Sequence, residues 1–183
     1  MSNFFTKTDL SRKDAESIIS ETLNNCDDGE LYLENSKSES IVLDDDKIKS
    51  SSYSSDLGYG LRAVTGEVVA YSHSNEISKK SLKQSASNLS STLKSQKGIY
   101  NHEIPKTNEK LYEDINPIEE KTLKSKLDLL KEVNNYTRAK GGIVKQVTAS
   151  FAGEHKSIEI IRSGGEVLTA VSYTHLRAHE TRH

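Results

Sequence analysis

The stretch from Leu57 to Ser74, LGYGLRAVTGEVVAYSHS, shows the clearest structural pattern in the chain. Apolar residues alternate with other side chains on both sides of a break at Thr65-Gly66-Glu67, and both arms are rich in Val, Tyr and Ala. Two such runs around a glycine turn predict a β-hairpin. Gly58 and Gly60 stand two apart in the first arm, so they should leave a shallow groove on one face of the strand or mark a bulge. No catalytic motif occurs in this stretch.

The composition excludes several classes of protein. The chain has 183 residues, which suits one domain or one domain plus a fragment. Its 25 basic and 27 acidic residues give a formal net charge of −2, whereas a general nucleic-acid binder usually carries a basic face. No apolar run approaches the roughly 20 residues that span a bilayer, and the N-terminus lacks the apolar core of a signal peptide. We therefore expect a cytoplasmic protein that binds neither nucleic acid nor a membrane.

Helical periodicity predicts three helices, near 11–26, 78–96 and 117–139. The first has Ser11 at its cap, and its apolar series ends at Cys26, the only cysteine. A single cysteine forms no disulfide within the chain, and we expect it to be a buried small hydrophobe rather than a nucleophile. The third helix begins at Asn116-Pro117. The residues expected to face inward from it are Leu123, Leu127, Leu130 and Val133.

Short strand-like runs surround the hairpin. Those near 31–34, 40–43 and 48–53 have short connections, so we expect an antiparallel β-meander. A second strand pair is predicted near 143–162, with Gly153 in its turn. The expected fold class is therefore α+β, with the meander packed against the helices.

Two further groups of residues resemble metal ligands only superficially. Asp44-Asp45-Asp46 lacks the spacing, the central glycine and the closing glutamate of an EF-hand, so we expect a solvated turn. His73, His102 and His155 lie far apart in the sequence. We expect each of them to be an ordinary polar surface residue.

The C-terminus ends in His179-Glu180-Thr181-Arg182-His183, which fits the HExxH pattern of zinc proteases, with His175 four residues earlier. The second histidine is the last residue, so no chain remains to supply a third ligand downstream. Val171 to Thr181 also resembles the conceptual translation of a common transposase-type sequencing adapter. We therefore expect 171–183 to be a disordered, adapter-derived artefact. The alternative hypothesis is a small zinc protease that uses His179 and His183, and we reject it on these grounds.

Five ordered segments of the chain resemble the N-terminal region of the TldD/PmbA metallopeptidase family, in its TldD-type branch. The likeness runs over almost all of 10–169. The segments are Asp28-Gly29-Glu30-Leu31-Tyr32, Val42-Leu43-Asp44-Asp45 with Ile48-Lys49, the run Gly58–Glu67, Lys126-Leu127-Asp128-Leu129-Leu130, and Gln146-Val147-Thr148-Ala149-Ser150.

The resemblance implies a cytoplasmic, two-domain zinc enzyme that hydrolyses peptides or unfolded proteins and pairs with a PmbA-like (TldE-like) paralogue. In that family an HExxxH helix of the second domain supplies two zinc-binding histidines and a glutamate that activates water. Residues 1–169 contain no such motif, because Thr107 stands where His102-Glu103 would need a second histidine, and His179-Glu180 has the wrong spacing.

We therefore assign no catalytic and no metal-binding residue to this chain, and the substrate-binding residues are unknown at this stage. The resemblance implies that 1–170 is a truncated N-terminal scaffold or substrate-docking domain. Zinc is expected only in the full-length protein, and the fragment is expected to be inactive. A stand-alone, non-catalytic binding or assembly module is the alternative.

Overall fold

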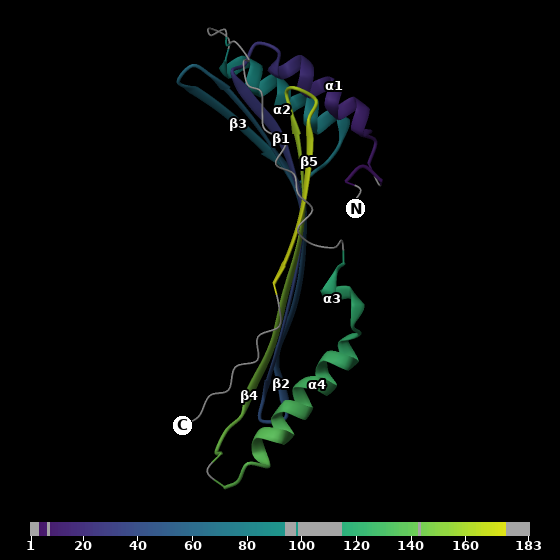
Figure 1. Cartoon of the computed structure of the whole chain (residues 1–183), viewed down its shortest axis with the longest axis vertical. Helices are drawn as coiled ribbons and strands as arrows, with labels where there is room; N and C mark the ends of the chain where they lie inside the picture. Colours follow the sequence, from purple (N-terminus) through teal and green to yellow (C-terminus); the bar gives the residue numbers. More distant parts are fainter. Residues whose placement is uncertain (1–3, 7, 94–97, 99–114, 143, 175–183) are drawn as a thin grey trace. The chain divides into compact units, whose positions relative to one another are not determined.

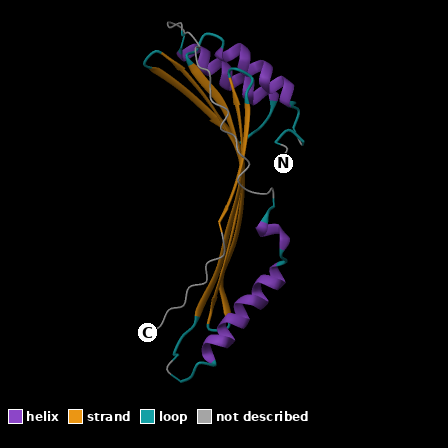
Figure 2. Cartoon of the chain, in the orientation of Figure 1, coloured by secondary structure: helices purple, strands orange, loops and turns teal. Residues whose placement is uncertain are grey.

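The computed structural model describes residues 4–6, 8–93, 98, 115–142 and 144–174 (Figure 1). An antiparallel sheet with the strand order β3-β2-β1-β4-β5 is combined with helices (Figure 2), which confirms the α+β class. The strands are β1 (Asp28–Asp44), β2 (Lys47–Thr65), β3 (Val68–Ser74), β4 (Thr148–Arg162) and β5 (Val167–Thr174). The helices are α1 (Arg12–Leu23), α2 (Lys79–Thr92), α3 (Pro117–Glu120) and α4 (Leu123–Arg138).

The chain divides into two compact units, and β1, β2, β4 and β5 contribute residues to both. Unit 1 comprises Met1–Asn35, Asp56–Glu113 and Ser157–Val171, and unit 2 comprises Ser36–Ser55, Asp114–Lys156 and Ser172–His183. Each unit has a hydrophobic core of its own.

The core of unit 1 lies between one face of the sheet and the helices α1 and α2, which contact each other. Ser11 caps α1 as predicted, because its side chain accepts a hydrogen bond from the Asp14 backbone N–H. Alternation along the strands turns every second residue toward the helices. The core residues from the three neighbouring strands include Leu31, Leu33, Tyr59, Leu61, Ala63 and Ala70, and the helices add Ile18, Ile19, Leu23, Leu82 and Leu89.

The predicted hairpin of 57–74 is confirmed. Thr65 pairs with Val68, and the turn between them contains Gly66 at a φ of 58°. A positive φ costs glycine little because it has no Cβ. The hairpin places β3 at one edge of the sheet, with β2 as its neighbour.

The core of unit 2 is smaller. Ile41 and Leu43 from β1, Leu130 from α4, and Ala149 and Phe151 from β4 are buried together. Leu127 and Val133 pack against this cluster and are partly buried.

The individual strands are longer than predicted. The runs near 31–34 and 40–43 form one strand, β1, and the run near 48–53 continues into the hairpin as β2. The polar segments between these runs contain no glycine or proline turn, and their backbone groups take part in the sheet. A strand tolerates exposed polar side chains, so the loss of apolar alternation did not mark a strand end.

Two paired strands were expected near 143–162, but this region forms one continuous strand, β4. In the sheet, β4 lies between β1 and β5. Gly153 makes no turn. A Cβ added at Gly153 would lie 3.4 Å from the Ile118 side chain, so the glycine permits a close approach of α3 to the strand. Ile143 itself lies outside the described residues.

The helix expected near 117–139 is interrupted. Lys121 has extended backbone angles, and Thr122 caps a new helix, α4, by accepting a hydrogen bond from the Ser125 N–H. Leu123 is consequently the first residue of that helix and is 52% exposed, which corrects its expected inward position.

Several predictions fall on residues outside the described part of the chain. These are residues 94–96 of the second predicted helix, the extended connection around His102, and the tail from 175 to 183. Strand β5 runs to Thr174, so the first four residues of the expected artefact form strand rather than disordered chain. A strand assignment carries no information on whether adapter DNA encodes these residues, and that expectation stays a prediction.

Candidate functional site

The face of unit 1 that points away from α1 and α2 carries polar and aromatic side chains. Gly60 pairs with His73, and Arg62 pairs with Tyr71, so these four residues share one face of the hairpin. Their chain neighbours Leu61 and Ala63 point the other way, into the core. This face is therefore the part of unit 1 where side chains are available for binding.

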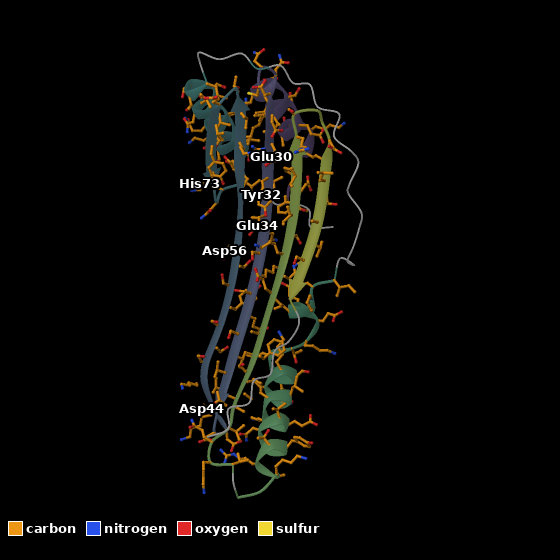
Figure 3. All side chains as sticks on the ribbon, turned by 60° about the vertical axis from the view of Figure 1, so that its left-hand side comes forward. Glu30, Tyr32, Glu34, Asp44, Asp56 and His73 are labelled. Carbon is orange, nitrogen blue, oxygen red and sulfur yellow. The ribbon has the colours of Figure 1, made fainter. Side chains whose placement is uncertain are left out.

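A hollow of about 250 Å³ lies on this face, and we call it the glycine hollow. Its lining comes from β1, β2, β3 and the residue after β3, and includes Tyr32, Glu34, Asp56, Gly60, Tyr71 and His73. Figure 3 labels four of these side chains, Tyr32, Glu34, Asp56 and His73, where the three strands lie side by side.

The hollow depends on two glycines. A Cβ at Gly60 would stand 2.5 Å from the Tyr71 hydroxyl oxygen, and one at Gly58 would stand 2.8 Å from the Ser74 carbonyl oxygen. Real side chains do not approach so closely, so the absence of Cβ lets the Tyr71 ring lie across β2. The shallow groove predicted from the spacing of the two glycines is thus present.

Aromatic rings form the outer wall of the glycine hollow. Tyr71 and His73 stack with their ring centroids 5.9 Å apart and an interplanar angle of 26°. Tyr71 is 65% exposed, although a ring of this size usually gains free energy from burial. An exposed, stacked ring pair at the edge of a cavity offers a surface for an aromatic or cationic ligand group.

Tyr32 donates a hydrogen bond to the Glu34 carboxylate on the neighbouring part of β1. Burial of the phenol raises the pKa of Tyr32 well above its usual range, and the bond to the Glu34 carboxylate acts in the same direction. Tyr32 is therefore a protonated donor at neutral pH, and the Glu34 carboxylate accepts its hydrogen bond.

The neighbouring basic residue on this face is held by acids. The Arg62 guanidinium donates to Asp28 at 2.6 Å and to Glu30 at 3.3 Å. Burial alone would lower the pKa of Arg62, but the two carboxylates outweigh it and raise that pKa. Glu30 also lies 3.9 Å from Arg162. These charges are balanced among themselves and tie β1, β2 and β4 together in unit 1.

Cys26 is buried at 4% exposure, as predicted. Burial raises the pKa of its thiol, which disfavours the nucleophilic thiolate.

Two histidines lie within the described residues. His73 is exposed, as predicted, but His155 is buried at 8% exposure, so its expected surface position is wrong. Burial, followed by the charge of Lys37, lowers the pKa of His155. His102 and the tail histidines lie outside the described residues.

Asp44 is the last residue of β1, and Asp45 and Asp46 form the exposed turn after it, as predicted, although the three carboxylates also make specific contacts. Asp45 and Asp46 have φ values of 44° and 64°, which suit a tight hairpin turn. Asp44 accepts hydrogen bonds from Gln146 at 2.8 Å and Thr148 at 2.9 Å, so the pKa of Asp44 is lowered. Asp45 and Asp46 pair with Arg138 of α4. The carboxylates thus connect this turn to other parts of unit 2.

Two buried charged groups had no signal in the sequence. Lys126 is 4% exposed; it pairs with Glu39, donates to the Ile118 carbonyl at 2.6 Å and lies 5.4 Å from the Phe151 ring centroid. Glu159 is 1% exposed and accepts a hydrogen bond from Arg12 at 2.7 Å. Each belongs to a single unit and serves its packing.

The residues in the described part of the chain do not fit a zinc site. Among them, no three His, Cys, Asp or Glu side chains converge as metal ligands would. In the same residues, no helix has both the length and the apolar character needed to cross a bilayer.

Comparison with known proteins gives a family for this arrangement. Residues 29–92, which include all of β2, β3 and α2 and most of β1, match the family model "PmbA/TldA metallopeptidase domain 1". The Metalloprotease TldD homolog of Buchnera aphidicola subsp. Acyrthosiphon pisum is 32% identical over 146 residues, which cover 79% of this chain and 30% of that protein. The homolog from Haemophilus influenzae is 32% identical over 147 residues, with 77% and 30% covered. The chain thus spans about a third of the length of these relatives.

Solved structures share the fold. TldE from Thermococcus kodakarensis superposes with a TM-score of 0.57 at 14% identity, over 87% of this chain and 37% of that one. A Bacteroides thetaiotaomicron protein, described as a candidate modulator of DNA gyrase, gives a TM-score of 0.65 at 19% identity, over 88% and 38%. These structures show the shared fold, and the sequence matches place the chain in the PmbA/TldD metallopeptidase family.

Proposed function

We propose that this chain is the N-terminal scaffold and substrate-docking part of a zinc metallopeptidase that hydrolyses peptides or unfolded proteins. The observation that carries the proposal is the match to the metallopeptidase family's first domain at residues 29–92, within relatives named as metalloproteases. This chain spans 30% of the length of two such relatives. The residues that bind zinc and activate water would then belong to the remaining length.

The edge strand β3 supports a docking role. Its sequence, VVAYSHS, contains none of the lysines or prolines that commonly block strand pairing at a sheet edge. Val69 and Tyr71 are 60% and 65% exposed. An extended peptide that adds to such an edge gains backbone hydrogen bonds irrespective of its sequence. That property suits a peptidase that acts on unfolded chains.

Because the catalytic residues are proposed to belong to the remaining length of the protein, this chain alone should be inactive. The test incubates the purified chain with zinc and an unstructured peptide, with and without a chelator. No cleavage is expected, since the described residues offer no zinc site. Cleavage that the chelator abolishes would overturn the proposed inactivity.

The enzymatic part of the proposal is tested at the gene. The genomic DNA beyond codon 169 should continue in frame to an HExxxH motif, and the complete protein should cleave peptides in a chelator-sensitive manner. An early genuine stop codon would favour the stand-alone binding module. The same DNA should lack the codons of 171–183, because we propose that adapter sequence supplied them.

We further propose that the complete protein is cytoplasmic and pairs with a TldE-like paralogue. The structural likeness to a protein named TldE supports this pairing, since the two chains then share the fold of this region. Co-expression of the complete protein with the paralogue from the same genome should yield a complex that co-elutes in size-exclusion chromatography. Two separately eluting proteins would contradict it.

A further inference from the structure

His155 is a buried histidine with one ring nitrogen that lacks a hydrogen-bond partner. It lies on β4 in unit 2 and is 8% exposed. Within the described part of the chain, its Nε2 atom makes no hydrogen bond. Most buried polar atoms in proteins have a partner, so such a nitrogen calls for an explanation. A neutral imidazole can be buried in this way at a moderate cost, whereas a charged ring whose N–H has no acceptor costs much more.

The charges around His155 oppose its protonation. Among the described residues, the charged side chains that act on the ring are Lys37 of β1 and Glu119 of α3. Lys37 donates a hydrogen bond to the Glu119 carboxylate, so the acid that could neutralise a protonated His155 already has a cation as its partner. Burial, followed by the positive charge of Lys37, lowers the pKa of His155, and the two outweigh the opposite effect of Glu119.

The short helix α3 is held over the same face of β4. Gly153 and His155 are two positions apart on the strand, so both face the same side of the sheet. A Cβ at Gly153 would lie 3.4 Å from the Ile118 side chain of α3, and Ile118 is buried. The next residue of α3, Glu119, is the one that is bonded to Lys37. Because α3 has only four residues, these side-chain contacts rather than its own backbone hydrogen bonds keep it in place.

We propose that His155 is an acid-sensitive switch: protonation of its ring releases α3 from β4 and β1 within unit 2. The protonated ring brings a second positive charge next to Lys37 and a buried N–H without an acceptor. Both penalties are relieved when α3 moves away and water reaches the ring. Lys126 donates to the Ile118 carbonyl independently of His155, so α3 stays attached to α4. This switch concerns the conformation of unit 2 and is independent of the proposed docking function.

The direction of the pH effect follows from the lowered pKa of His155. The state in which the ring is open to water binds the proton more tightly than the state in which the ring is buried. The contact of α3 with β4 is therefore complete at neutral pH. It is lost as pH falls from the ordinary histidine range through the lowered pKa.

The test follows the imidazole signals of His155 and the side-chain methyl signals of Ile118 by NMR in the whole chain, as pH is lowered from neutral through the histidine range. We expect both sets of signals to change with the same midpoint, and the Ile118 methyls to move to the positions of an exposed isoleucine. The methyl signals of Leu31 and Leu61 in the core of unit 1 should stay constant. Ile118 signals that do not follow His155 overturn the proposal. Simultaneous loss of the unit 1 signals also overturns it, because the transition would then be global unfolding.

Variants separate His155 from other titrating groups. His155→Phe keeps a ring but cannot take up a proton, so the Ile118 signals should remain at their neutral-pH positions over the same range. His73→Gln removes an exposed imidazole from unit 1 and should leave the pH response of Ile118 unchanged. A response of Ile118 that persists in His155→Phe contradicts the proposal.

A second variant tests the switch if His155→Phe does not fold. Lys37→Met removes the positive charge beside the ring, so the midpoint of His155 should move to higher pH. The midpoint of Ile118 should move with it, because protonation of the ring is what releases α3. An Ile118 midpoint that does not move together with that of His155 contradicts the proposal.

Discussion

The ammonium group of Lys126 lies inside unit 2, although the sequence alone would suggest that this charged group is exposed to solvent. Its aliphatic part lies among the apolar residues of that unit, and the charge is matched by Glu39 and the Ile118 carbonyl. A buried charge is tolerated when a partner and further hydrogen bonds satisfy it. At the residue scale, the stability of unit 2 therefore depends on both members of the pair.

Lys126→Met should destabilise the chain by about 3 kcal/mol, because it leaves the Glu39 carboxylate buried without its cation. Lys126→Met combined with Glu39→Met should recover most of that loss, since no charge then remains buried. Urea unfolding followed by circular dichroism gives the free energies of both variants. A double variant as unstable as Lys126→Met would show that the pair itself, rather than the uncompensated charge, determines the result.

Glu159 should make the stability of unit 1 depend on pH. Burial raises the pKa of Glu159, while Arg12 opposes the shift and Glu16 adds to it. The folded state then holds a proton that the unfolded state has released, so stability falls as pH rises from the ordinary glutamate range through the raised pKa.

Glu159→Gln removes this titration. The urea midpoint of the wild type, measured relative to that of Glu159→Gln, should fall as pH rises through this window and stay constant above it. Because all other groups are common to the two chains, the difference isolates Glu159. A difference that is flat with pH, or that rises, would contradict the raised pKa.

At the element scale, the break between α3 and α4 illustrates local chemistry that prevails over apolar periodicity. Asn116 caps α3 and Pro117 follows it, while Thr122 caps α4 only a few residues later. Two caps so close together satisfy the backbone N–H groups of two helices rather than one.

Thr122→Ala should cost about 1 kcal/mol of unfolding free energy, because the Ser125 N–H loses the hydroxyl that accepts its hydrogen bond at 3.2 Å. Thr122→Ser keeps that oxygen and should stay close to the wild type. Thermal and urea unfolding of both variants provide the measurement. Equal losses in the two variants would place the contribution of Thr122 in its methyl group instead of its cap.

At the scale of the whole molecule, the chain presents two cores and one candidate binding face but, among its described residues, no set of zinc ligands. The last nine residues contain three histidines, His175, His179 and His183, whose side chains are of a type that binds zinc. These residues lie outside the described part of the chain.

Zinc should therefore leave the thermal midpoint of the 183-residue chain unchanged, since ligands raise stability only by binding the folded state more tightly than the unfolded one. Calorimetry with and without zinc checks this, and the chain ending at Thr174 serves as the control. A zinc-induced rise that persists in the shorter chain would reveal a metal site in the folded units and contradict the prediction.

The sequence alone was sufficient for the elements whose signals are local. The hairpin of 57–74, the Ser11 cap, burial of Cys26 and the glycine groove follow from turn chemistry, capping and alternation, which act within a few residues. The same local patterns carried the resemblance to the family.

Only the tertiary structure decided the features that depend on contacts distant in sequence. Strand lengths follow from hydrogen bonds to neighbouring strands, so β1 and β4 continue through polar segments where their own residues gave no such signal. Burial of Lys126, His155 and Glu159 depends on partners brought from other elements. The glycine hollow likewise needs β1, β2 and β3 together, because its carboxylates and its rings belong to different strands.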